Sequence, residues 1–206
     1  MLMRALTCGD AAVLFEVETL DEAVALAAAV RAAELPVVVD VVPAARTVLV
    51  VTDPGADLGA LRHTVSELPV AEAAVTADAD PVEIHVVYDG PDLDEVASLT
   101  GLGVDEVVAA HTATPWRVAF AGFAPGFPYL VGGDPRLQVP RRDEPRTSVP
   151  AGSVGLAGQF SGIYPRATPG GWQLLGRTAA TLWDTDRHPP ALLAPGDRVR
   201  FVRVDR

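Results

Sequence analysis

The chain has 206 residues, a net charge of −11 and one cysteine, Cys8, so it can bury a real core but can form neither an intrachain disulfide nor a cysteine-based metal cluster. No apolar run approaches the ~20 residues that span a bilayer, and the start of the chain lacks a signal-peptide pattern. We therefore expect a soluble cytoplasmic protein with no membrane partner and no metal site.

Charge is distributed unevenly along the chain. Residues 1–135 contain 5 Arg and 21 Asp or Glu, whereas residues 136–206 contain 11 Arg and 6 acidic residues, and there is no Lys. The acidic first part disfavours nucleic acid as a partner. The arginines of the second part have the planar, two-pronged group that binds carboxylate or phosphate. Genome composition accounts for the missing lysine more readily than for the asymmetry.

The first third of the chain predicts a small α+β domain. Residues 11–17 predict a strand, and residues 19–35 predict a helix that opens with a capping box of Thr19 and Glu22. Two β-branched runs, 36–42 and 47–52, predict a hairpin, and residues 57–68 predict a second helix capped by Asp57. A further strand within residues 70–81 would complete β-α-β-β-α-β, the split βαβ or ferredoxin-like arrangement. We place this domain at residues 1–78.

The rest of the chain, residues 79–206, predicts a mainly-β barrel. A strand at 82–90 is followed by two short helices, 91–101 and 104–113. Between residues 121 and 176 about a third of the positions are Gly or Pro, and strand-like pieces alternate with turn residues. Such a pattern is typical of a barrel with long, structured loops. The predicted pieces are Ser153–Ala157, Trp172–Arg177, Thr181–Trp183 and Arg198–Val204.

Familiar catalytic motifs are missing from the sequence. It contains no phosphate-binding G-x-x-x-x-G-K-[ST] loop, no G-x-G-x-x-G after a strand, no H-E-x-x-H and no G-x-S-x-G. We therefore expect that any chemistry is completed by another subunit.

The stretch "GFAPGFPYLVGGDPRL" (122–137) combines bulky rings with residues that fix or free the backbone. Phe123, Phe127 and Tyr129 lie among Pro125 and Gly126, whereas a disordered spacer would lack such rings. The combination predicts an ordered loop that forms a ligand wall. A purely structural barrel loop is the alternative.

Four segments resemble a known family: "GFAPGFPYL", "DPRLQVPRRDEPRTSVPAGSVGLAG", "SGIYPRATPGGWQLLGRT" and "PPALLAPGDRVRF". They are similar to the family of B-type 5-oxoprolinase subunits (PxpB/KipI), also described as allophanate hydrolase subunit 1 or carboxyltransferase subdomain C/D. The resemblance covers nearly the whole chain and is dense from residue 82 onward. The family commonly has a basic and then a polar residue where this chain has Gln159-Phe160, so a cation is lost there.

The resemblance implies a fold and an activity. The fold is an α+β N-terminal domain followed by a cyclophilin-like barrel. The activity is that of a hydrolase complex with homologous C-type and further A-type subunits, which uses ATP with Mg at a shared site to open 5-oxo-L-proline to L-glutamate. Phosphorylation of the lactam oxygen would create a leaving group. Two alternatives stay open: an inhibitor of a sensor histidine kinase, and a component of an allophanate hydrolase or urea amidolyase-type enzyme.

Three residues are candidates for catalysis. His111 ends a predicted helix, where it is either a general base or hydrogen-bond donor, or only a favourable partner of the helix dipole. Arg177 is expected to bind an anion or to tie loop carbonyls together. Ser153 lacks an adjacent base in sequence, so positioning of substrate by hydrogen bonding is favoured over covalent catalysis.

The remaining candidates are expected to bind substrate. Two aromatic loops would form an apolar pocket with few polar points, or a face on which a partner subunit docks. Arginines within the family motifs would bind a carboxylate or phosphate. The predicted binding residues are Phe123, Pro125, Gly126, Phe127, Tyr129, Arg136, Arg146, Gln159, Ser161, Tyr164, Pro169, Gly170 and Trp172.

Overall fold

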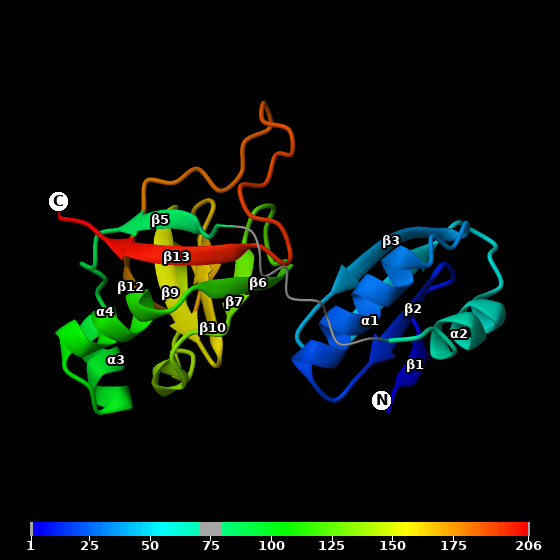
Figure 1. Ribbon diagram of the computed structural model, residues 1–206, viewed down its shortest axis with the longest axis horizontal. Helices are drawn as coiled ribbons and strands as arrows, with labels where there is room; N and C mark the ends of the chain where they lie inside the picture. Colours follow the sequence, from blue (N-terminus) through cyan, green and yellow to red (C-terminus); the bar gives the residue numbers. More distant parts are fainter. Residues whose placement is uncertain (1, 71–79, 206) are drawn as a thin grey trace. The chain divides into compact units, whose positions relative to one another are not determined.

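The computed structural model describes residues 2–70 and 80–205 (Figure 1). The chain divides into two compact units, Met1–Val75 and Thr76–Arg206. The domain boundary predicted at residue 78 lies outside the described residues.

The first unit contains a four-stranded sheet and two helices. Its elements are β1 (Arg4–Thr7), β2 (Ala12–Glu16), α1 (Leu20–Ala32), β3 (Val38–Pro43), β4 (Thr47–Thr52) and α2 (Leu58–Ser66). Alternation along β4 buries Val48 and Val50, which join Phe15 of β2 and Leu26 of α1 in one core. The helix α1 lies across one face of this sheet (Figure 1).

Both predicted helix caps are confirmed. Thr19 Oγ1 accepts a hydrogen bond from Glu22 N at 3.2 Å, and Glu22 Oε2 accepts from Thr19 N at 3.1 Å, which completes the capping box. Asp57 Oδ1 accepts from the backbone N–H groups of Gly59 and Ala60. These side chains satisfy amide donors that the first turn leaves without helical partners.

The ferredoxin-like arrangement of the first unit is not confirmed. The sheet order is β1-β2-β4-β3, and all neighbours are antiparallel. The edge beside β2 is therefore formed by β1, which comes before the first helix and was not expected. The strand predicted within residues 70–81 falls largely on residues 71–79, outside the described residues.

The second unit is a nearly closed, mixed β-barrel, as the composition predicted. Its seven-stranded sheet has the order β12-β9-β10-β7-β6-β13-β5, in which β13 and β5 are parallel and the other neighbours are antiparallel. The two edge strands approach each other where Val87 and Arg177 exchange two backbone hydrogen bonds of 2.9 Å. We call this junction the seam. The strands are β5 (Val82–Val86), β6 (Trp116–Ala121), β7 (Pro128–Val131), β9 (Ser153–Ala157), β10 (Phe160–Ile163), β12 (Gln173–Arg177) and β13 (Arg198–Arg203).

Two helices and a small sheet complete the second unit. The helices α3 (Leu93–Thr100) and α4 (Val104–Ala113) pack side by side (Figure 1) and contribute Val96, Val107 and Val108 to the barrel core. A separate two-stranded sheet pairs β8 (Arg146–Val149) with β11 (Thr168–Gly170), and η1 (Pro135–Leu137) is a short 3-10 helix. In the described residues no helix is long and apolar enough to cross a membrane.

Strand positions in the Gly- and Pro-rich region were only partly predictable. The pieces at Ser153–Ala157 and Trp172–Arg177 correspond to β9 and β12. The strand predicted at Thr181–Trp183 is wrong, because only an isolated bridge joins Trp183 to Ala191 in a long loop. Conversely, β7, β8 and β10 have four residues each and follow turn residues closely, so they lack a visible alternation.

Candidate functional site

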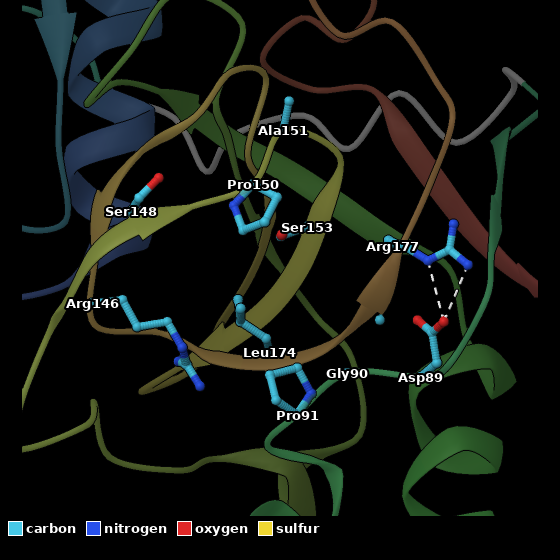
Figure 2. A pocket seen from close by; sticks show the side chains of 11 residues that line it. Asp89, Gly90, Pro91, Arg146, Ser148, Pro150, Ala151, Ser153, Leu174 and Arg177 are labelled. Atoms are coloured by element: carbon cyan, nitrogen blue, oxygen red, sulfur yellow. Dashed lines mark hydrogen bonds and ion pairs between the residues drawn. The ribbon is translucent and has the colours of Figure 1, made fainter.

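A pocket of about 370 Å³ lies beside the seam of the barrel (Figure 2). Its walls come from the segment after β5, from β8 and the turn that follows it, and from the ends of β9 and β12. Its polar side chains are Asp89, Arg146, Ser148, Ser153 and Arg177. Figure 2 shows Arg146 on one side of the pocket and the Asp89–Arg177 pair on the opposite side. Two arginines and two hydroxyls around a small cavity can bind an anion.

Close backbone contacts hold the seam together. A Cβ added to Gly176 would lie 2.2 Å from the backbone O of Val87, and one added to Gly90 would lie 2.2 Å from the backbone O of Leu174. Gly90 N also donates to Leu175 O at 3.0 Å. Glycine is therefore required on both sides of the seam, which brings Asp89 next to β12.

The buried carboxylate of Asp92 organises one side of the pocket. Its Oδ1 accepts from Arg142 Nη1 at 2.9 Å and from Arg146 Nη2 at 2.7 Å, and its Oδ2 accepts from Leu174 N at 2.7 Å. Within the described part of the chain, Arg142 Nε and Arg146 Nη1 are buried without a hydrogen-bond partner. One carboxylate thus faces two guanidinium groups, which leaves net positive charge at the pocket wall.

The opposite side of the pocket holds a second, more exposed ion pair. Arg177 Nε and Nη2 each lie 3.2 Å from Asp89 Oδ2. The side chains are 59% and 23% exposed, respectively. Arg177 and Ser153 are directly opposite each other on neighbouring strands β12 and β9. Two of the three predicted catalytic residues are therefore adjacent, and predicted binding residue Arg146 lines the same pocket.

His111, the third predicted catalytic residue, lies in the barrel core away from this pocket. It is fully buried, its Nδ1 is 2.7 Å from Tyr88 Oη, and its Nε2 is 2.9 Å from Ser161 Oγ. Its ring stacks on Phe201 with centroids 4.3 Å apart. Burial lowers the pKa of His111 to about 3 and raises the pKa of Tyr88. A neutral imidazole therefore links α4 to β10 and to the segment after β5.

The two aromatic loops do meet, but their rings pack against one another. The ring of Phe127 lies 5.1 Å from that of Tyr164 and 5.3 Å from that of Trp172, in edge-to-face contact. All three side chains are buried, and Tyr129 packs against this small core. Phe123 contacts the edge of this core, with its ring centroid 5.3 Å from that of Phe127, but its side chain is 60% exposed and its φ is positive at 67°.

The other predicted binding residues are dispersed over the barrel. Arg136 forms an exposed ion pair with Asp134 at 2.6 Å, and Gln159 lines a second cavity of about 160 Å³. Gly126 packs against the Leu182 backbone, where its positive φ and close contacts favour glycine. Pro125 and Pro169 are exposed, and Gly170 lies against the Tyr164 hydroxyl. Most of the predicted set thus lies in the seam pocket, the His111–Ser161 pair or the aromatic core, and Arg136 and Gln159 belong to none of these groups.

Three residues that build the seam pocket carried no sequence signal as site residues. Asp92 precedes a helix in "GPDLDE" and resembles an ordinary N-cap, yet its side chain makes no capping hydrogen bond. Asp89 lies just before it, and Ser148 belongs to the short strand β8. A carboxylate at a cap position that instead pairs with distant arginines can be recognised only from the fold. Among the described residues no cluster of His, Cys, Asp or Glu could hold a metal ion.

Fold and site together define a protein with an α+β unit and a mixed barrel whose seam carries an arginine-lined pocket. The family model for the carboxyltransferase domain, subdomain C and D, matches residues 3–193. The chain belongs to this family, as its motifs predicted.

Curated relatives are named as the B subunit of 5-oxoprolinase. The protein from Escherichia coli O157:H7 is 54% identical over 124 residues, or 59% of this chain and 57% of the relative. The protein from Bacillus subtilis is 51% identical over 126 residues, or 60% of this chain and 52% of the relative. The matched part of the chain thus spans about half the length of these two relatives.

Solved structures share the fold. The crystal structure of the protein TTHA0988 superposes with a TM-score of 0.78 and 38% identity, and the match covers 100% of this chain and 40% of that one. The urea amidolyase of K. lactis gives a TM-score of 0.76 at 20% identity over 98% of this chain and 15% of that one, a likeness of fold alone.

Proposed function

We propose that this chain is the B-type subunit of an ATP-dependent hydrolase that opens 5-oxo-L-proline to L-glutamate. The observation that carries the proposal is the identity of 51% and 54% to proteins named as the B subunit of 5-oxoprolinase. The seam pocket adds chemical support, because 5-oxo-L-proline is a small cyclic amide with a single carboxylate, and arginine is suited to bind that group.

The pocket suits a small anion and does not fit ATP. None of its eleven lining residues is aromatic, so no side chain of the pocket can stack on a nucleotide base. We therefore assign ATP and Mg to a site completed by partner subunits. The cyclophilin-like classification of the barrel belongs to the same proposal.

The proposed partners are the homologous C-type and the A-type subunits of the same complex. A substrate amide resists hydrolysis because of its resonance, so activation and water attack need more groups than this pocket contains. In our proposal the chain binds and orients the lactam through Arg146, Arg177 and Ser153. The other subunits provide the activating chemistry.

The test is an assay of ATP-dependent glutamate release from 5-oxo-L-proline. The chain would be purified alone and with its cognate A-type and C-type partners. We expect turnover only with the full set. Turnover by the isolated chain would contradict the shared site, and a full set that is inactive with 5-oxo-L-proline would reject the proposed substrate.

A second candidate is a urea amidolyase-type activity on allophanate. The observation that favours it is a 32% identity over 120 residues to the urea amidolyase of Saccharomyces cerevisiae, although this match covers only 6% of that protein. Allophanate is also a small monocarboxylate, but its hydrolysis releases ammonia and carbon dioxide and no glutamate. An assay of ammonia release from allophanate by the full set of subunits therefore distinguishes the two substrates. The kinase-inhibitor hypothesis stays a prediction.

A further inference from the structure

Both arginines of the seam pocket are paired with carboxylates from one four-residue segment, Asp89–Asp92. This segment follows β5 and is attached to β12 by backbone hydrogen bonds of Gly90 N to Leu175 O and Asp92 N to Leu174 O. Asp92 pairs with Arg146 on one side, and Asp89 pairs with Arg177 on the other. The two pairs differ in burial and geometry, and the difference indicates which of them a ligand can open.

The Asp92 pair is costly to open. The Asp92 side chain is 4% exposed, and its two oxygens accept three hydrogen bonds of 2.7 to 2.9 Å, one of them from a backbone amide. Breaking such a buried pair leaves an uncompensated charge and is strongly destabilising. Asp92 is therefore a positioning residue that holds Arg146 at the pocket wall.

The Asp89 pair is more open to exchange than the Asp92 pair. Arg177 Nε and Nη2 contact one carboxylate oxygen, Asp89 Oδ2, at 3.2 Å each, whereas the arginine contacts of Asp92 are 2.7 and 2.9 Å long. The Arg177 side chain is 59% exposed and that of Asp89 is 23% exposed, so this ion pair is partly open to solvent and contributes less to stability than a buried pair. A second carboxylate that enters the pocket therefore meets a cation whose present ion pair is weak.

We propose that Asp89 is an internal stand-in for the carboxylate of a small acid, and that this acid binds Arg177 by displacing Asp89. Arg146 on the facing wall supplies the remaining positive field, and the hydroxyls of Ser148 and Ser153 are available to the polar groups of the ligand. Asp89 also discriminates between ligands, because its negative charge repels anions that cannot form a two-pronged contact with the Arg177 guanidinium.

The inference rests on the proposed function only for its probe, 5-oxo-L-proline. Titration calorimetry on the full chain, without partner subunits, would compare this acid with 2-pyrrolidinone, the same lactam ring without the carboxylate. We expect saturable binding of 5-oxo-L-proline that weakens with salt, and no binding of 2-pyrrolidinone in the same range.

Three variants separate the roles of the pair. Asp89→Asn keeps the size of the side chain and removes the competing charge, so affinity should rise by up to about fivefold. Arg177→Gln should lower affinity by at least about tenfold, and Arg177→Lys should give an intermediate loss because it keeps the charge without the fork. Arg203→Gln is the matched control, since Arg203 forms a similar exposed pair with Asp105 at 3.0 Å outside the pocket, and should leave affinity unchanged.

Thermal unfolding of each variant checks that the barrel is intact. The inference is overturned if the wild-type chain does not bind 5-oxo-L-proline, if 2-pyrrolidinone binds equally well, or if folded Asp89→Asn gains no affinity. An equal loss in Arg203→Gln and Arg177→Gln would also overturn it. Tight binding by the chain together with an assembled complex that lacks 5-oxoprolinase activity would reject the proposed function and leave the displacement of Asp89 standing.

Discussion

At the scale of single residues, burial decides what His111 can do. A histidine at a helix C-terminus was a reasonable candidate for acid–base chemistry, but this side chain is fully buried between Tyr88 and Ser161. A depressed pKa of about 3 keeps it neutral at physiological pH. In this form it stabilises the barrel, and contact with a substrate would require the core to open.

This burial predicts a pH dependence of stability. Between about pH 6.5 and 3 the unfolded chain binds a proton at His111 and the folded chain does not, so stability falls as pH falls through 6.5. His111→Gln should reduce this acid-side slope. Urea unfolding at several pH values would measure it, and His85→Gln, on the exposed side of β5, is the control. Equal slopes in wild type and His111→Gln would contradict the assignment.

Asp92 and Asp105 both pair with arginines, but the first is buried and the second is exposed. Urea unfolding should therefore show different effects when each is replaced. Asp92→Asn leaves two partly buried guanidinium groups without their buried carboxylate and should lower the free energy of unfolding by about 3 kcal/mol. Asp105→Asn removes an exposed partner and should change it by less than about 1 kcal/mol. A similar small effect of both changes in urea titrations would show that Asp92 does not anchor Arg146.

At the scale of elements, closure of the barrel depends on the approach of β12 to the segment after β5. Gly176 has no room for a side chain against Val87 O. Gly176→Ala should therefore destabilise the protein by about 1–3 kcal/mol or more. Gly171→Ala, whose added Cβ would meet nothing closer than 3.6 Å, is the control. Thermal unfolding compares the two, and equal melting temperatures would disprove tight packing at the seam.

The elements that could be predicted are those whose cause is local. The capping box of Thr19 and the cap at Asp57 follow from neighbouring residues, and both are present. The edge strand β1 and the short barrel strands are stabilised by pairing with distant partners. Four residues are too few to show the alternation of apolar and polar side chains that predicts a strand. Only some residues of the seam pocket could be predicted from the sequence, for the same reason. Arg146, Ser153 and Arg177 lie in recognisable motifs, whereas Asp89 and Asp92 act only through long-range contacts.

At the scale of the whole molecule, each unit has a hydrophobic core of its own. One core gathers Phe15, Leu26 and Val50, and the other gathers Ile84, Leu156 and Phe201 with their neighbours. A chain limited to residues 80–206 should therefore fold alone and keep the seam pocket. Circular dichroism and calorimetric titration of this fragment would check both points. An unfolded fragment would mean that the barrel depends on the first unit.

The seam has one more consequence, for how binding and opening of the barrel are linked. The bridge between Val87 and Arg177 joins the end of β5 to β12, and Arg177 also faces the pocket. A bound acid would have to leave before these strands part, so occupancy slows the opening by mass action. The rate of amide hydrogen exchange at Val87 and Arg177 therefore reports occupancy of the pocket. This rate should fall in inverse proportion to the ligand concentration once that concentration exceeds Kd.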